Sequence, residues 1–145
     1  KKLSLSALIQ NILQSSSPQI SEKSLRLETQ IEEITFKTNE QMVHSIFENL
    51  IENAIKYTPA QGQIFVSLHH EQDKIIFSVT DNGPGLSEIE KERIFDSFYR
   101  ADESRAEVSV TGLGLAIVEK NVQELHGTID VVSILGKGTT FTVNL

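Results

Sequence analysis

Three polar side chains recur along one helical stretch of this sequence. Asn49, Asn53 and Lys56 follow one another at spacings of four and three residues, so they occupy neighbouring positions along one border of a helix. A carboxamide oxygen is a suitable ligand for a hard cation such as Mg²⁺, and an ammonium group is a suitable point charge for phosphates. The spacing therefore indicates a metal–phosphate site, although two asparagines on a solvated helix face would give the same pattern.

Two glycine-containing motifs could receive other parts of a ligand. Asp81 ends a strand-like run and is followed by Gly83 and Gly85, so a carboxylate that can accept hydrogen bonds from an exocyclic amine lies beside backbone that a ring can approach. The segment 112–115, Gly-Leu-Gly-Leu, opens a helix, and free N–H groups at a helix start attract anions. A tight turn at the first motif and helix–strand packing at the second remain alternatives.

The polar segment that separates these motifs is too long for an ordinary connection. Residues 82–111 carry Arg100 and Arg105 just after an aromatic cluster, and long segments of this kind are commonly lids or binding loops. An arginine on such a segment can reach a terminal phosphate. We expect the aromatic side chains, Phe95, Phe98 and Tyr99, to anchor the segment to the core.

The helix that carries the two asparagines has a hydrophobic stripe beside them. Its apolar residues recur at helical spacing and predict one narrow buried face: Val43, Phe47, Leu50 and Ala54. Thr38 or Asn39 caps its start, and Pro59 and Gly62 end it. Upstream, we expect a strand at 3–5 and a helix capped by Ser6. The residues of that helix expected to face the core are Leu8, Ile9, Ile12 and Leu13.

The remaining chain alternates strand and helix signals. Period-two alternation predicts a half-buried strand at 25–31, with a shorter one at 34–37 and a hairpin of strands at 64–68 and 74–80. A short charged helix is expected at 87–95. The glycine-led helix runs from 112 to about Leu125 with Gly127 as its stop, and a hairpin at 128–135 and 139–145 turns at 136–138.

These elements predict an α+β fold: a two-layer α/β sandwich with a mixed, mostly antiparallel sheet of about five strands and three main helices on one face. The chain has 145 residues, which suits a single domain over 1–145. A net charge of −7 without basic blocks argues against nucleic-acid binding, and the absence of cysteine excludes thiolate sites. No apolar run is long enough to span a bilayer. The chain opens without Met, so we expect it to be a piece of a longer protein.

The order of the motifs carries more information than any one of them. NLIENAIKY, DNGPGL, FDSFYRADESR, TGLGLAIV and GKGTTF resemble, in sequence, the N, G1, F, G2 and G3 boxes of the catalytic, ATP-binding domain of bacterial sensor histidine kinases. The resemblance covers essentially the whole chain. It implies the Bergerat ATP-binding fold, which gyrase and MutL share, with an ATP lid at about 84–111.

The resemblance also implies roles for individual residues. Asn53 matches the Mg²⁺ ligand, supported by Asn49; Lys56 matches a phosphate contact, and Tyr57 an aromatic that packs on adenine. Asp81 matches the carboxylate that reads the adenine amino group. The remaining expected ATP contacts are Gly83 and Gly85 in the adenine pocket, Arg100 and Arg105 in the lid, Thr111, Gly112, Leu113, Gly114 and Leu115 at the phosphates, and Thr139 at the adenine end. Asn53, Lys56 and Arg100 are the expected catalytic residues.

Two departures from the family pattern qualify these implications. Ser109 and Val110 occupy positions where the family often has glycines, which restricts the lid backbone. The phosphoacceptor histidine of the family and its dimerising helical hairpin have no counterpart here, and we expect them before Lys1. The chain alone is therefore expected to be a monomer that binds Mg²⁺ and ATP but turns ATP over slowly.

The leading hypothesis is a histidine kinase domain that transfers the γ-phosphoryl group of ATP to a histidine of that hairpin and thereby serves a response regulator. The domain is expected to be cytoplasmic, within a membrane-anchored bacterial protein. A serine protein kinase of the anti-sigma type on the same fold is one alternative. The other is a degenerate sensor domain that binds nucleotide without phosphoryl transfer.

Overall fold

The computed structural model describes residues 2–96 and 114–145, and its elements follow the expected order. The elements are β1 (Lys2–Ser4), α1 (Leu5–Ser15), α2 (Ser17–Glu22), β2 (Arg26–Ile31), β3 (Thr35–Lys37), α3 (Glu40–Tyr57), β4 (Gln63–Glu71), β5 (Lys74–Asp81), α4 (Glu88–Arg93), α5 (Gly114–Glu124), β6 (Thr128–Ile134) and β7 (Gly138–Asn144).

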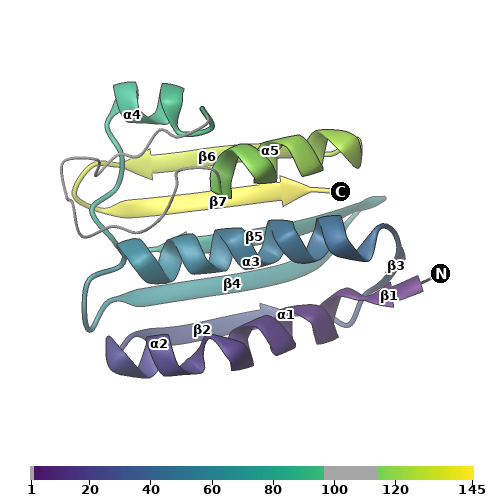
Figure 1. The fold of residues 1–145 in the computed structure, drawn as a ribbon, viewed down its shortest axis with the longest axis horizontal. Coiled ribbons are helices and arrows are strands. Elements are labelled where there is room, and N and C mark those ends of the chain that lie inside the picture. The colour runs from purple at the N-terminus through teal and green to yellow at the C-terminus, as the bar shows by residue number, and fades with distance from the viewer. Residues whose placement is uncertain (1, 97–113) are drawn as a thin grey trace.

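Among the described residues, five strands form one sheet in the order β2-β4-β5-β7-β6, and β1 pairs with β3 in a separate two-stranded sheet. The β2–β4 pair is parallel and the other pairs of the large sheet are antiparallel. Helices α1, α3 and α5 cover one face of this sheet in a single layer (Figure 1). The predicted two-layer, mostly antiparallel architecture is confirmed. No helix in the described ranges is long and apolar enough to cross a membrane.

Helix α3 is the central helix of the layer. The Asn39 Oδ1 atom caps its start by accepting a hydrogen bond of 2.9 Å from the backbone N–H of Met42. Asn39 is one of the two residues predicted as the cap. The predicted stripe is buried, and so are Ile46, Ile51 and Ile55, because α1 and α5 pack on either side of α3. Beneath it, the ring of Phe47 stacks on that of Phe77 in β5 with centroids 4.2 Å apart.

Three local predictions were wrong. Ser4, not Ser6, caps α1 by accepting a hydrogen bond from the N–H of Ala7, and Ser6 is buried inside the helix. Strand β2 is not half-buried, because it lies at the sheet edge, where five of its six residues are exposed.

The third correction concerns the end of α5. His126, at φ 62°, takes the left-handed position there, with its N–H donating to the carbonyl of Gln123 and the N–H of Gly127 donating to that of Val122. Gly127 is required for a different reason: a Cβ on it would lie 2.2 Å from the Asn144 carbonyl oxygen.

Candidate functional site

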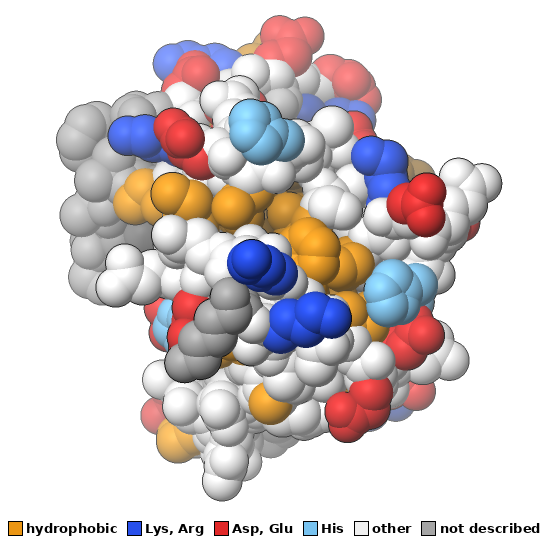
Figure 2. All heavy atoms as spheres, turned by 90° about the vertical axis from the view of Figure 1, so that its right-hand side faces the viewer, with side chains coloured by type: hydrophobic (Ala, Val, Ile, Leu, Met, Phe, Trp, Pro, Cys, Tyr) orange, Lys and Arg blue, Asp and Glu red, His pale blue; other side chains and the backbone are white. Residues whose placement is uncertain are grey.

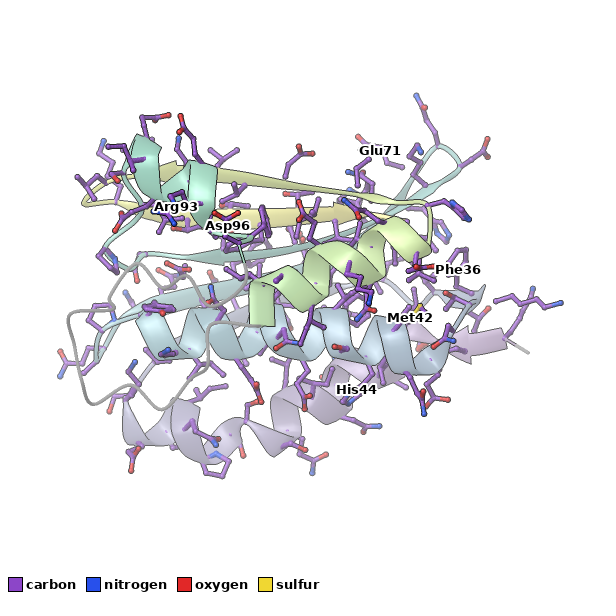
Figure 3. All side chains as sticks on the ribbon, turned by 45° about the horizontal axis from the view of Figure 1, so that its top comes forward. Phe36, Met42, His44, Glu71, Arg93 and Asp96 are labelled. Carbon is purple, nitrogen blue, oxygen red and sulfur yellow. The ribbon has the colours of Figure 1, made fainter. Side chains whose placement is uncertain are left out.

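Most of the predicted site residues that the structure describes lie towards one end of the two layers. The C-terminal ends of α3, β5 and β6 and the N-terminal end of β7 all lie at the left of Figure 1, away from both termini. Figure 2 shows the opposite end, where a band of hydrophobic side chains crosses the face beside two Lys or Arg side chains. Phe36 and Met42, labelled in Figure 3, also lie at that opposite end.

Three polar side chains form a row across neighbouring strands on the helix-covered face, and we call Asp81, Thr139 and Ser133 the strand cluster. Thr139 pairs with Asp81 across β5 and β7 and with Ser133 across β6 and β7. All three residues are buried. The cluster therefore fixes short polar groups against the end of the sheet.

Asp81 has backbone partners and, among the described residues, no ion pair. Its Oδ1 atom accepts a hydrogen bond of 2.8 Å from the N–H of Gly83. Burial raises the pKa of the Asp81 carboxyl above its usual value, while backbone hydrogen bonds from Gly83 and Thr139 act in the opposite direction. A buried carboxylate without a cation is suited to accept hydrogen bonds from a neutral N–H donor of a ligand.

Glycines allow the surrounding backbone to come close to Asp81. A Cβ on Gly83 would lie 2.8 Å from the Tyr57 carbonyl oxygen, and one on Gly138 would lie 2.1 Å from that of Asp81. Gly85 has φ 73°, and a Cβ there would lie 2.2 Å from the carbonyl oxygen of Ile134. Because these three residues have no side chain, the backbone of the end of α3, the turn after β5 and the β6–β7 hairpin can pack closely together.

The second group of predicted residues lies where α3 meets α5, and we call Asn49, Asn53, Lys56 and Gly114 the helix cluster. Asn49 donates from Nδ2 to the Ser45 carbonyl oxygen at 2.8 Å and to the Ser45 hydroxyl at 3.2 Å. A Cβ on Gly114, the first residue of α5, would lie 3.0 Å from the Asn49 Oδ1 atom. The Asn49 carboxamide oxygen thus faces the start of α5.

The other helix-cluster side chains are partly exposed on α3. In the described part of the chain, the Asn53 carboxamide forms no hydrogen bond, and the Lys56 Nζ atom lies 4.8 Å from the centroid of the Tyr57 ring. The donor set fits Mg²⁺, which needs few protein oxygens when phosphate and water complete its shell. Asn49 and Asn53 supply carboxamide oxygens, and no group of three acidic, His or Cys ligands is found among the described residues.

Other predicted residues fall in neither cluster. Leu115 follows Gly114 in the first turn of α5. Arg100, Arg105, Thr111, Gly112 and Leu113 lie outside the described residues, together with Ser109 and Val110. Before that gap, Arg93 and Asp96 lie side by side at the end of α4 (Figure 3), with Nε and Oδ2 3.5 Å apart.

The sequence motifs do not predict two residues that make hydrogen bonds in this region. The Ser133 hydroxyl contacts three other groups of this region. Counting back from the turn at 136–138 places Ser133 opposite Thr139 in the hairpin. Lys23 donates from Nζ to the carbonyl oxygens of Ile55 and Lys56 at 2.7 and 3.1 Å, so it caps the end of α3. No sequence signal predicts that contact, because it depends on the end of α2 lying near the end of α3.

Comparison with known proteins gives consistent matches. Residues 38–145 match the family described as histidine kinase-, DNA gyrase B- and HSP90-like ATPases. The chain is similar to the heme sensor protein HssS of Staphylococcus saprophyticus, with 37% identity over 141 residues that make up 97% of this chain and 30% of that protein. HssS of Staphylococcus aureus is 34% identical over 144 residues, 99% of this chain and 31% of that protein. The chain therefore spans less than a third of these relatives.

Solved structures show the same fold. The mycobacterial sensor histidine kinase MprB superposes with a TM-score of 0.87 at 23% identity, covering 100% of this chain and 95% of that one. The crystal structure of full-length ShkA in complex with AMPPNP gives a TM-score of 0.85 at 26% identity over 99% of this chain and 30% of that one. The fold expected from the sequence is thereby confirmed.

Proposed function

The chain belongs to the family of histidine kinase-, DNA gyrase B- and HSP90-like ATPases, and from this premise we propose that it is the ATP-binding catalytic domain of a sensor histidine kinase. In this proposal it places the γ-phosphoryl group of ATP for transfer to a histidine on a separate helical hairpin, which then serves a response regulator. The names of its relatives, heme sensor and sensor histidine kinase, support a signalling role. The domain would act in the cytoplasm as part of a membrane-anchored protein.

The strand cluster supports binding of the adenine. Asp81 is 7% exposed and held by backbone donors, and no cationic side chain pairs with it in the described ranges. This single observation carries the proposal, because a buried carboxylate that no cation pairs with keeps lone pairs that can accept a hydrogen bond from a donor of the ligand. The exocyclic amine of adenine supplies such a donor. Gly83, Gly85, Tyr57 and Thr139 would complete the pocket.

The helix cluster would hold the phosphates and the metal. Asn53, with Asn49 beside it, would supply carboxamide oxygens to Mg²⁺, and Lys56 and the start of α5 at Gly114 and Leu115 would attract the phosphate oxygens. When bound, Mg²⁺ neutralises the charge that develops on the transferred phosphoryl group. We also assign Arg100, Arg105, Thr111, Gly112 and Leu113 to the phosphate end, on their match to the family motifs.

Catalysis in this arrangement is mostly positioning. The side chains of this domain orient the triphosphate and neutralise its charge, and the attacking imidazole nitrogen comes from the histidine of the hairpin. The domain by itself is then expected to bind ATP and to hydrolyse it slowly, since the proposed nucleophile belongs to the separate hairpin.

The test is a transfer assay with γ-labelled ATP. This chain is mixed with Mg²⁺, labelled ATP and the histidine-bearing hairpin of the same protein, with a chelator-treated sample as the control. We expect acid-labile, base-stable label on the hairpin. Acid-stable label on serine would instead identify a serine kinase, and nucleotide binding without any label would identify a sensor domain without transfer activity.

A further inference from the structure

Ser133 has three polar neighbours in the strand cluster, and its side chain is 6% exposed. The backbone N–H of Leu86 donates to its hydroxyl at 2.7 Å. The Gly138 carbonyl oxygen lies 3.0 Å from the same hydroxyl, and the Thr139 hydroxyl lies 2.8 Å from it. Ser133 thus links the turn after β5 to both strands of the β6–β7 hairpin.

The directions of these bonds follow from the number of protons available. A serine hydroxyl has one proton to donate and two lone pairs that accept. The Gly138 carbonyl can only accept, so the Ser133 proton points to it, and the Leu86 N–H can only donate, so it takes one lone pair. All three contacts are hydrogen bonds only if the Thr139 hydroxyl donates its proton to the second lone pair. The Thr139 oxygen then has only lone pairs left for a ligand.

This direction matters because Thr139 lies next to Asp81 in the row. Asp81, when ionised, is also an acceptor, so two acceptors lie on adjacent strands at the end of the sheet where the proposed function places the base. An amino group of the base can donate hydrogen bonds to these two acceptors, whereas the lone pairs of a carbonyl oxygen would be repelled by the lone pairs of Asp81 and Thr139. Adenine carries an amino group at this position of the purine, and guanine carries a carbonyl.

We propose that Ser133 is a positioning residue that holds the Thr139 hydroxyl as an acceptor and thereby contributes to selection of a 6-aminopurine over a 6-oxopurine. The inference rests on the proposed function, since it assumes that a purine nucleotide binds beside Asp81. Without the Ser133 hydroxyl, Thr139 is free to rotate and donate to a purine carbonyl. Discrimination should fall while the phosphate contacts of the helix cluster stay intact.

The same sheet offers a matched control on its open face. Ser67 is 8% exposed, and its hydroxyl lies 2.7 Å from that of Ser78. Its neighbours in β4, Val66 and Leu68, are buried under the helices, so Ser67 points to the opposite face from Ser133. Ser67→Ala therefore removes an equally buried hydroxyl from the same sheet without touching the strand cluster.

Titration calorimetry of this chain with Mg·AMP-PNP, Mg·GMP-PNP and Mg·tripolyphosphate tests the inference. In Ser133→Ala we expect the preference for the adenine nucleotide to fall roughly fivefold, the scale of one neutral hydrogen bond. Affinity for tripolyphosphate should not change, and Ser67→Ala should keep the wild-type preference. Ser133→Thr, which keeps the hydroxyl, should restore the preference.

A double-mutant cycle separates this role from simple destabilisation. Thr139→Val should lower the preference by itself, and adding Ser133→Ala to it should lower the preference no further, because both act through one hydrogen bond. If Ser133→Ala does not fold, Ser133→Cys replaces the hydroxyl with a slightly larger thiol, which is a much weaker donor and acceptor, and the same loss is expected.

The outcomes distinguish the inference from the function on which it rests. A Ser133→Ala protein that binds Mg·AMP-PNP with an unchanged preference over Mg·GMP-PNP, or a cycle in which the two losses add, would overturn the role of Ser133 alone. A wild-type chain that binds neither nucleotide would overturn the proposed function itself.

Discussion

The strand cluster and the helix cluster differ in how firmly the protein holds their polar groups. Asp81, Ser133 and Thr139 are short, buried and hydrogen-bonded to backbone or to one another. Asn53 and Lys56 are partly exposed on the surface of a helix. A base is rigid and is recognised by fixed donors and acceptors, whereas a hydrated, charged triphosphate can be held by side chains that adjust. We therefore expect specificity to reside in the strand cluster and most of the metal-dependent affinity in the helix cluster.

The largest effect on stability is expected in the core, where α3, which carries the helix cluster, packs on β5, which carries Asp81 of the strand cluster. Phe47 of α3 stacks on Phe77 of β5, so Phe47→Ala should lower the free energy of unfolding by about 3–5 kcal/mol, as for other buried aromatics. Urea unfolding measures the loss. Phe36→Ala, at a half-buried position far from both clusters, is the control and should cost less. Equal losses in the two variants would contradict a central role for the Phe47–Phe77 stack.

Asn53→Ala should show most clearly that the metal-dependent part of the affinity comes from the helix cluster. We expect affinity for Mg·ATP to fall by about 100-fold or more, since loss of even an outer partner of a metal ligand costs 10–100-fold. Calorimetry with and without Mg²⁺ should show that the metal no longer strengthens binding, while circular dichroism stays unchanged. Asn144→Ala, at the far end of β7, is the control. An unchanged affinity of Asn53→Ala for Mg·ATP would contradict the assignment of the metal site to α3.

Asp81→Asn should weaken adenine recognition and yet stabilise the free protein at neutral pH. Because burial raises the Asp81 pKa in the folded state, its ionisation opposes folding. The stability linked to a protonated Asp81 is present below the usual carboxyl pKa of about 3.9 and is lost as the pH rises through the higher folded-state pKa. The gain in Tm from Asp81→Asn should therefore be largest near pH 7 and shrink in acid.

Two measurements follow for this variant: Tm against pH, and relative affinity for ATP and GTP. Asp130→Asn, at an exposed position of β6, should change neither. A Tm gain that grows as the pH falls would contradict the burial argument, and an unchanged preference for ATP would remove Asp81 from base recognition.

The smallest effect is expected away from both clusters, at the end of α5. His126→Gly should raise the free energy of unfolding by about 0.5–1 kcal/mol, because glycine takes the left-handed conformation without the strain of a side chain. Gly127→Ala, one residue later, should instead destabilise, because of the nearby Asn144 carbonyl. Thermal unfolding checks both signs. Nucleotide affinity should stay at the wild-type value in His126→Gly, and a change would mean that α5 couples its two ends.

Local patterns in the sequence were sufficient for most of the elements. The Asn39 cap, the stripe on α3 and the hairpin of β4 and β5 each depend on residues close in the chain, so spacing and capping chemistry predicted them. The failures have a different origin. Ser4 caps α1 because β1 ends there in its pairing with β3, and β2 is exposed because it lies at the sheet edge.

The motif order determined the family and the candidate ligand contacts, because each box is a contiguous run whose residue types have their own chemistry. Tertiary structure decided how those contacts are held. Ser133 matters only because β6 pairs with β7 and Leu86 contacts this hairpin, and Lys23 caps α3 only because α2 ends near the C-terminal end of α3. Hydrogen bonds between residues far apart in the chain depend on the packing of whole elements, and spacing along a single element carries no record of that packing.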